Sequence, residues 1–547
     1  MLKILKLKNY QFFGLLVFLG LLFFSARGGP ASGRGWYFLS DDWHWLYLAK
    51  NRVWSWDIFM TNYEGLQVGG SYNPLSFLVF KIFYNLFHLK AGFYHLVSIL
   101  VHSLNAYLVF ILVNKIFVQD ETKKYLAYST AILFLLWPTQ TEIVNWLAAW
   151  PHLWASTFYL LSFIYYLNYR QKDKAKFLGL SLLFFIISLG FKENALSLPI
   201  LIFLWEAYLF SKKAVKNWSW AFSAYLLLLA AFLFLRQLIT GALFGYYGQS
   251  QLDTSLLAYF ANLLAFLSSQ FTFGVVNIWF YKFYYHYLDL LFIFGASFLS
   301  LYFFFTWYYK KWQQFTLVVS GMIVLLPMLP LGLHHLNFAG ERYMYLSSAF
   351  IIVWFLVLIS ESGLSAKKMS YLCIILSVVI LFPLEIKNNI WQQANTLSRR
   401  IISSYQDLKL APDVKLISVG LPDNLSGAEV FRNNLQQALE LSYPNYKGEI
   451  KTLPAYLFLN TKNKNDHLLK WRQDALGWFV ESVDGQFVVT GQTSIIKDNV
   501  YFELWNYNYQ NYTANLMRLM PAEELKQQLL RGEVKWLTFD RGRLIVY

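Results

Sequence analysis

Charged residues are scarce in this chain of 547 residues: they make up 14% of it, whereas hydrophobic residues make up 57%. Soluble domains contain about 25% charged residues. Cysteine is nearly absent as well, because Cys373 stands alone within an apolar run. A single cysteine excludes disulfide bonds within the chain and argues against a cysteine-based metal site or a thiol nucleophile.

Acidic residues are the rarer charged class, with 31 Asp and Glu against 46 Lys and Arg, so the formal net charge is +15. A charge of this size can indicate nucleic acid as a partner. Here, however, the basic residues stand in short clusters between apolar runs, which is typical of loops on the inner side of a membrane. We therefore expect membrane lipids, and no nucleic acid, among the partners.

Long apolar runs recur between residues 11 and 385, and several approach the ~20 residues that a helix needs to cross a bilayer. The first run resembles a signal peptide, but retaining it as a span gives the later loops a consistent charge pattern. Placing the basic loops inside predicts about eleven spans. Residues 256–287 fit either a span or an outer interfacial segment, and we prefer the second interpretation. The sequence thus predicts a polytopic α-helical membrane protein.

The last part of the chain has a different pattern, in which short strand-like runs alternate with helical stretches. We expect a strand within residues 413–421 and a helix over residues 426–441. This divides the chain into a transmembrane domain over residues 1–390 and a small soluble α/β domain over residues 400–547. An odd number of spans places this second domain on the extracytoplasmic side of the membrane. We expect that membrane to be the plasma membrane.

Two adjacent carboxylates, Asp41 and Asp42, follow the first apolar run and stand between Leu39 and Trp43. Neither solvation nor helix formation explains an acidic pair in this setting. A carboxylate can remove a proton from a hydroxyl group as general base, and fixed cations can stabilise a departing phosphate. Adjacent residues do not share a face of a helix or strand. We therefore expect separate roles: one is the base, and the other orients it or binds the acceptor or a metal.

More polar residues fall on the same predicted outer side. One predicted span, residues 93–112, carries a stripe of His95, Ser98, His102 and Asn105 on one helical face. The outer loops hold Glu142, Lys192, Glu193, His334, His335, Glu341 and Arg342. Simpler interpretations stay open: hydrogen bonds between helices for the stripe, an interfacial ion pair for Lys192 with Glu193, and loop solvation for Glu142.

Several phrases resemble, in order, those of the C-type (GT-C) glycosyltransferases, above all the protein O-mannosyltransferase-like and TMTC-like members. The likeness covers about residues 10–390 and includes an acidic phrase after the first span. The phrases are FLSDDWHWL, NPLSFLVFKIFYNLF with HLVSILVHSLNAYLVFILV, LWPTQTEIVNWLAAW, GFKENALSLPILIFLWE and FAGERYMYLSSAF. The chain departs from the family pattern where Ser347 replaces a proline and Asn73 replaces an arginine, and it shows no helical repeats at its C-terminal end.

The resemblance implies an integral membrane enzyme that takes a sugar from a polyprenyl-phosphate donor. It implies that Asp41 is the catalytic base, and that cationic residues of outer loops hold the donor phosphate. The matching cations are Lys192, Arg342 and His334 or His335. Glu193 and Glu341 match acidic family positions, and His102, Asn105 and Glu142 complete the set of expected supporting residues.

The sequence therefore predicts a glycosyltransferase that moves a monosaccharide to a hydroxyl acceptor, with inversion favoured. The alternatives are a transporter or flippase of lipid-linked sugars, or a non-catalytic membrane scaffold. Transporters place their sites near the midplane between repeats, whereas here the charges gather at outer ends and no repeat is visible. No definite cofactor is predicted, and a divalent metal stays open. His44, His95 and His102 with Asp42 could bind one, although their spacing matches no diagnostic motif.

Overall fold

The structure is a computed structural model of the whole chain. It describes all residues except 1–6, 26–34, 62–69, 71, 118–123, 216–220, 244–255, 274–296, 298–299, 333–337, 362–363, 365, 412, 460–468, 475–476, 484–485, 490–493 and 507–512. The chain forms two compact units. The first, here the helical unit, contains Met1–Ser25, Val53–Leu86 and Phe93–Asn388. The second, here the mixed unit, contains Ala26–Arg52, Phe87–Gly92 and Asn389–Tyr547.

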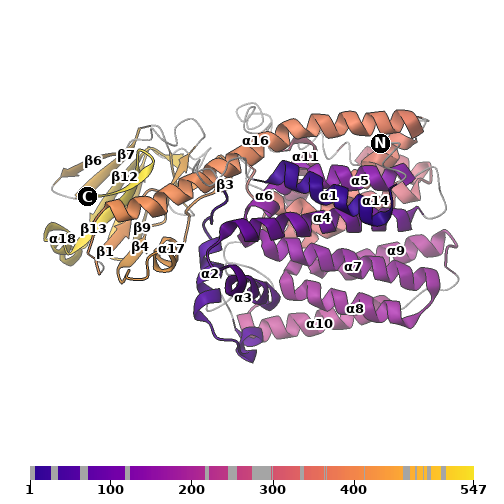
Figure 1. Cartoon of the computed structure of the whole chain (residues 1–547), viewed down its shortest axis with the longest axis horizontal. Coiled ribbons are helices and arrows are strands. Elements are labelled where there is room, and N and C mark those ends of the chain that lie inside the picture. Colours follow the sequence, from indigo (N-terminus) through magenta and orange to yellow (C-terminus); the bar gives the residue numbers. More distant parts are fainter. Residues whose placement is uncertain are drawn as a thin grey trace. The chain divides into compact units, whose positions relative to one another are not determined.

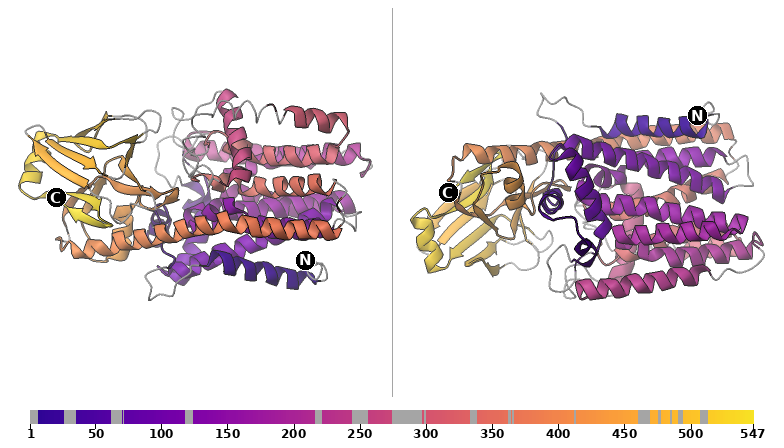
Figure 2. Two further views of the ribbon diagram at one scale, coloured as in Figure 1. Left: turned by 90° about the horizontal axis from the view of Figure 1, so that it is seen from above. Right: turned by 60° about the horizontal axis from the view of Figure 1, so that its bottom comes forward.

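The helical unit is built from helices that run side by side with nearly aligned axes in most cases (Figures 1 and 2). They are α1 (Asn9–Phe24), α3 (Pro74–Phe87), α4 (Ala91–Ile116), α5 (Lys124–Leu136), α7 (Trp150–Lys172), α8 (Ala175–Phe191), α9 (Leu198–Ser211), α10 (Ala221–Thr240), α11 (Leu256–Thr272), α14 (Trp312–Leu325), α15 (Tyr345–Ser360) and the first part of α16 (Ala366–Asp407). The end of α3 and the start of α4 belong to the mixed unit, as does the last part of α16.

Among the described residues, five helical segments are long and apolar enough to cross a membrane. They are Ala91–Ile116, Glu193–Ser211, Ala221–Thr240, Glu341–Ser360 and Lys368–Asp407. Shorter apolar helices accompany them, at Asn9–Phe24, Pro74–Phe87, Tyr125–Leu136, Ala175–Phe191 and Trp312–Met328. The expectation of a helical membrane protein thus agrees with the structure, whereas the count of about eleven spans is not confirmed by these lengths. Residues 274–287, part of the segment with two interpretations, lie outside the described residues.

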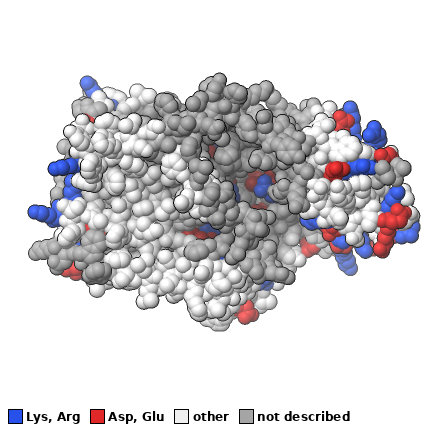
Figure 3. Space-filling view, turned by 180° about the vertical axis from the view of Figure 1, so that it is seen from behind, with Lys and Arg blue, Asp and Glu red and all other residues white. Residues whose placement is uncertain are grey.

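The basic residues that we expected on the inner side mark one end of the helical unit. Lys115 at the end of α4 donates to Asn168 of α7 (2.5 Å), and Arg170 of α7 pairs with Glu206 of α9 (2.9 Å). The last turns of these three helices therefore meet. On the face drawn in Figure 3, most of the surface of the helical unit is uncharged, and Lys and Arg stand out at one end of it.

At the opposite ends of these helices the chain forms short, largely buried segments. They are η5 (Pro138–Gln140), α6 (Thr141–Asn145), η6 (Leu147–Ala149), η7 (Glu193–Ser197), η9 (Leu326–Met328) and η10 (Glu341–Met344). Segment η10 packs against η5 and α6, and η7 packs against α7, α8 and α14. Irregular backbone at membrane depth is tolerated where protein surrounds it or where it lines a wet cavity. These segments carry four of the polar residues that the sequence singled out, namely Glu142, Glu193, Glu341 and Arg342.

The mixed unit contains three sheets in the described part of the chain. The order β14-β13-β1-β4 joins β14 (Arg543–Val546), β13 (Val534–Asp540), β1 (Lys415–Ser418) and β4 (Glu449–Thr452), with β1 parallel to β13 and β4. The antiparallel order β6-β7-β12-β10-β9 joins β6 (Leu469–Asp474), β7 (Gly477–Ser482), β12 (Leu516–Pro521), β10 (Val500–Trp505) and β9 (Ser494–Lys497). The order β11-β8-β5-β2-β3 joins β11 (Thr513–Ala514), β8 (Gln486–Val489), β5 (Ala455–Leu459), β2 (Leu421–Leu425) and β3 (Ala428–Glu429).

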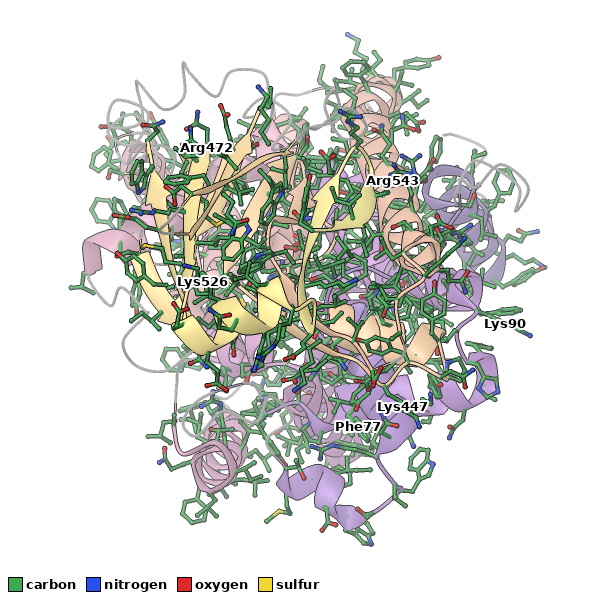
Figure 4. All side chains as sticks on the ribbon, turned by 90° about the vertical axis from the view of Figure 1, so that its left-hand side faces the viewer. Phe77, Lys90, Lys447, Arg472, Lys526 and Arg543 are labelled. Carbon is green, nitrogen blue, oxygen red and sulfur yellow. The ribbon has the colours of Figure 1, made fainter. Side chains whose placement is uncertain are left out.

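Helices of the mixed unit include α2 (Asp42–Asn51), α17 (Leu435–Ser442) and α18 (Glu523–Leu530), and α2 packs against α17. Charged side chains such as Arg472 of β6 and Arg543 of β14 are exposed (Figure 4). The strand expected within residues 413–421 is confirmed by β1. The helix expected over residues 426–441 is wrong in its first half, because Gly427 (φ 105°) and Asn434 (φ 70°) adopt backbone conformations that a right-handed helix excludes.

Candidate functional site

Glu142 and Arg342 form the first part of a polar cluster in the helical unit. The carboxylate of Glu142 accepts hydrogen bonds from the backbone N–H of Gly340 (3.2 Å) and of Arg342 (2.8 Å), and it forms an ion pair with the Arg342 guanidinium. Gly340 has φ 94°, a conformation that favours glycine. Since Glu142 is fully buried, its interpretation as a solvated loop residue is wrong.

The guanidinium of Arg342 is held in a fixed orientation. Its central carbon lies 4.9 Å from the ring centre of Trp146 and 4.5 Å from that of Tyr343. Its Nη2 donates to the Tyr343 hydroxyl (2.7 Å), and 19% of the side chain is exposed. Arginine presents several donors in a rigid plane and suits carboxylate or phosphate ligands. Arg342 is thus oriented and still accessible to a ligand.

A second ion pair joins Glu341 of η10 to Lys387 of α16, and both side chains are almost completely buried. Lys387 also donates to the carbonyl oxygen of Pro138 (3.3 Å). Among the described residues, Oε1 of Glu341 has no hydrogen-bond partner. The sequence interpretation missed Lys387, although a lone lysine soon after the apolar run that ends at Pro383 was a usable signal.

Lys192, Glu193 and Arg236 form the third group. Nζ of Lys192 lies 3.4 Å from Glu193, and Nε of Arg236 lies 3.7 Å from the same carboxylate. Arg236 also donates to the carbonyl oxygen of Gly70 (2.8 Å). The ion pair between Lys192 and Glu193 is therefore present in the structure. Arg236 was not among the predicted site residues, although it ends the apolar stretch of α10.

His152 connects these groups. It lies in the first turn of α7, is 4% exposed, and its Nδ1 has no hydrogen-bond partner among the described residues. Lys192 and Arg342 both lie close enough to act on it electrostatically. Its ring also meets that of Tyr343 edge-on, with centres 5.5 Å apart. His152 was not predicted as a site residue; the signal was a histidine at the start of an apolar span.

The charges of this cluster do not cancel. Within the described residues, four cations (Lys192, Arg236, Arg342 and Lys387) meet three carboxylates (Glu142, Glu193 and Glu341). The cations therefore outnumber the carboxylates by one among these described residues. The backbone N–H groups at the start of α7 add a further positive potential near His152. The cluster is therefore suited to an anionic ligand.

His102 and Asn105 have a structural role in α4. His102 Nδ1 lies 2.8 Å from the Tyr345 hydroxyl and its Nε2 lies 3.0 Å from the carbonyl oxygen of Leu135. Asn105 donates to the Tyr345 hydroxyl (3.1 Å) and to the carbonyl oxygen of Leu153 (3.2 Å). Both residues are fully buried. Hydrogen bonds between helices, the simpler interpretation of the stripe, thus account for these two side chains.

The acidic pair belongs to the mixed unit, and its two members have different partners. Asp42 is fully buried at the start of α2, and its Oδ2 accepts the backbone N–H of Leu39 (2.9 Å). Asp41 is partly buried, and its Oδ1 accepts a hydrogen bond from Nδ2 of Asn434 (2.9 Å). Asp42 therefore stabilises the chain reversal before α2, whereas Asp41 points toward the C-terminal part of the chain.

The surroundings of Asp41 are polar. Arg432 donates to Asp423 through Nε and Nη2, the latter at 2.9 Å. Burial alone would lower the pKa of Arg432, but the carboxylates of Glu429, Asp423 and Asp41 raise it above the usual value. Burial also lowers the pKa of His44 below its usual value of 6.5.

Two of the predicted donor-binding residues, His334 and His335, lie outside the described residues. The remaining cations of that prediction, Lys192 and Arg342, belong to the helical unit, and Asp41 and Asp42 belong to the mixed unit. In the part of the chain that the structure describes, no group of three or more His, Cys, Asp or Glu side chains could hold a metal ion. His44, His95, His102 and Asp42 do not form such a group.

Comparison with known proteins gives a short region of similarity. No protein-family model matches the chain. It is 30% identical to the human (Homo sapiens) protein O-mannosyl-transferase TMTC3 over 105 residues, which are 19% of this chain and 11% of that protein. The mouse (Mus musculus) protein of the same name is 31% identical over 105 residues, with the same coverage. The chain thus matches about a ninth of the length of these relatives, and in that stretch it is distantly similar to a glycosyltransferase.

Proposed function

We propose that this protein is a membrane glycosyltransferase that moves one sugar from a polyprenyl-phosphate donor to a hydroxyl acceptor on the extracytoplasmic face. The observation that carries the proposal is the cationic cluster around His152, in which Lys192 and the oriented, partly exposed Arg342 both lie near the histidine inside an apolar helical unit. The partial similarity to a protein O-mannosyl-transferase supports the same class of reaction.

In this reaction Asp41 removes the proton from the acceptor hydroxyl while the oxygen of that hydroxyl attacks the anomeric carbon of the sugar. The bond between that carbon and the phosphate oxygen breaks, and the polyprenyl phosphate leaves with the electron pair. The leaving phosphate gains negative charge, which fixed cations stabilise in the transition state. A single base on a direct displacement path predicts inversion at the anomeric carbon.

We assign the donor phosphate to Arg342 and Lys192. Arg342 offers an oriented and partly exposed guanidinium, and charge-assisted hydrogen bonds to phosphate are stronger than neutral ones. Glu142 and Glu193 hold these two cations in place through their ion pairs. Glu341 with Lys387 fixes η10, the segment that carries Arg342, to α16. The polyprenyl chain would lie along the apolar helices.

The proposal is tested with purified protein in lipid nanodiscs and a panel of radiolabelled polyprenyl-phosphate sugars. Membrane extract supplies the hydroxyl acceptors. We expect the parent protein to transfer label from one of the donors, and the Asp41→Asn variant to bind that donor without transfer. Asp57→Asn is the matched control, because Asp57 is an exposed carboxylate of the same N-terminal region.

Two results would contradict the proposal. If the parent protein transfers no sugar but moves the lipid-linked sugar between leaflets of a vesicle, the transporter interpretation takes its place. If Asp41→Asn and Asp57→Asn reduce transfer equally, Asp41 is not the base.

A further inference from the structure

We propose that Asn434 is a positioning residue for Asp41, so that the C-terminal part of the chain takes part in the transfer reaction. This inference rests on the proposed function, in which Asp41 is the general base. Its basis is the hydrogen bond from Nδ2 of Asn434 to Oδ1 of Asp41, 2.9 Å long, between residues 393 positions apart in the sequence.

The backbone fixes the amide of Asn434. Asn434 directly precedes α17 and has φ 70°, a left-handed conformation that asparagine adopts more readily than most residues. Leu435 and Leu439 of α17 are buried, and α17 packs against α2, the helix that begins next to Asp41. The packing of α17 against α2 therefore fixes the position of the Asn434 amide.

A second contact fixes the backbone directly before Asp41. The backbone N–H of Ser40 donates to the carbonyl oxygen of Val430 (2.8 Å). Ser40 itself has φ 38°, which is unusual for a residue with a side chain. The segment from Val430 to Asn434 thus contacts the backbone before Asp41 and the carboxylate of Asp41 together.

The geometry leaves one oxygen of Asp41 for the acceptor. Among the described residues, the Asp41 side chain makes no hydrogen bond besides the one from Asn434. An amide that donates to Oδ1 restricts rotation of the carboxylate and directs Oδ2 in a fixed direction. Positioning of this kind matters because a base must lie within hydrogen-bond distance of the proton that it removes.

The chemical nature of the partner fits a base as well. Among the described residues, His44, Arg432 and Tyr456 are titratable groups that interact electrostatically with Asp41. Arg432 donates to Asp423 instead of Asp41. A cation bonded directly to Asp41 would make the carboxylate a weaker base, because it stabilises the charged form. A neutral amide orients the carboxylate and adds no formal charge.

An exchange of the two side chains tests this role. The variants are Asp41→Asn, Asn434→Asp and the double variant that carries both changes, which restores one amide and one carboxylate at the contact. Asn506→Asp is the matched control, because Asn506 is an exposed asparagine of the same unit with a similar φ of 58°.

We expect Asn434→Asp to lower the melting temperature, since it places two carboxylates in contact, and to lower turnover about 10²-fold through misplacement of the base. The acidic limb of its pH–rate profile should move to higher pH, because two adjacent carboxylates retain a proton more readily. The exchanged double variant should recover the melting temperature but not the turnover. Asn506→Asp should match the parent protein in all three measurements.

Turnover and a pH profile of Asn434→Asp that match those of Asn506→Asp would overturn the positioning role. A melting temperature that stays low in the exchanged variant would overturn the contact itself. A parent protein that transfers no sugar would overturn the proposed function and with it the role of Asn434 in transfer. In that event, recovery of the melting temperature by the exchanged variant would still show that the contact is right.

Discussion

The two units of this protein hold their buried carboxylates in different ways. In the helical unit, Glu142 and Glu341 are paired with Arg342 and Lys387. In the mixed unit, Asp42 accepts a backbone N–H and Asp41 accepts a side-chain amide. The first arrangement joins opposite charges, whereas these hydrogen bonds to the acidic pair come from neutral groups, with Arg432 and His44 acting on Asp41 electrostatically.

This difference suits two different tasks. The ion pairs fix these charges in position, and in the cluster around His152 four cations meet three carboxylates among the described residues. Such a region suits an anionic ligand. A carboxylate that accepts a hydrogen bond from a neutral donor is oriented, and an oriented carboxylate suits a base. Under the proposed function, the helical unit binds the anion and the mixed unit removes the proton, and each role can be tested separately.

The largest expected effect concerns Asp41, and it tests whether Asp41 and Asp42 have separate roles. Because general-base catalysis contributes about 10²–10⁴-fold, Asp41→Asn should lower kcat about 10³-fold. Its melting temperature should change little, since an asparagine oxygen can still accept from Asn434. Asp42→Ala should have the reverse pattern, because it leaves the buried N–H of Leu39 without its acceptor and costs about 1 kcal/mol of stability. Steady-state kinetics and melting temperatures of both variants check this prediction.

The assignment of separate roles would fail if both variants lost turnover to the same extent. In that case the two carboxylates would act as one unit, and the backbone contact of Asp42 would not describe its main role.

The second prediction tests whether the paired charges of the helical unit are structural. Lys387→Met leaves Glu341 as a buried charge without its partner, and removing one member of a buried pair costs about 3 kcal/mol or more. Denaturant titration in mixed micelles measures the free energy of unfolding. The double variant Lys387→Met with Glu341→Gln should recover more than half of the loss, since no uncompensated charge remains.

Lys311→Met is the matched control for Lys387→Met. Lys311 pairs with Glu361 at 2.6 Å, but their side chains are 49% and 35% exposed. Exposed pairs contribute about 0–1 kcal/mol. Equal losses in Lys311→Met and Lys387→Met would show that burial does not distinguish the two pairs.

The third prediction addresses anion binding. Arg342→Lys retains the charge but loses the planar contacts with Trp146 and Tyr343 and the geometry of the pair with Glu142. We expect the KM for the donor to rise about tenfold, which corresponds to about 1.4 kcal/mol, while kcat with saturating donor changes less. Donor titration in the transfer assay measures both quantities. A loss of kcat with an unchanged KM would assign Arg342 to the transition state instead of donor binding.

The sequence allowed much of the helical unit to be predicted, because apolar runs and basic loops follow directly from the cost of burying charge in lipid. It also identified Glu142, Lys192, Glu193, Glu341 and Arg342, which the structure brings into ion pairs. Lys387, which lies between Glu385 and Asn388, and His152 were not predicted as site residues. Their partners come from segments far away in the sequence, and spacing along one helix does not report them.

The environment of Asp41 could not be predicted for a related reason. Its partner Asn434 lies within a stretch that favours helix by composition, but Ala428–Glu429 forms β3, Asn434 has a left-handed backbone and the helix begins only at Leu435. The packing of α2 against α17 decides that local conformation, and single-sequence propensities do not contain such a tertiary contact.

The smallest expected effect concerns His44, one turn from Asp41. Burial lowers the pKa of His44 below its usual value of 6.5; Asp41 opposes this shift, and Arg52 adds to it. In the unfolded chain the ring gains its proton near pH 6.5, about the value of an exposed histidine. Below that pH the unfolded state therefore binds more protons than the folded state, so stability falls as the pH falls and is fully present above it.

We expect the melting temperature of the parent protein to fall between about pH 7.5 and about pH 5.5, and His44→Gln to lose part of this fall because glutamine does not titrate. His88→Asn is the control, since His88 is an exposed histidine of the same unit and its φ of 47° is acceptable to asparagine. This variant should keep the fall of the parent protein. If His44→Gln keeps it too, the burial of His44 does not contribute to the pH dependence of stability, because a histidine that is equally charged in both states contributes no dependence on pH.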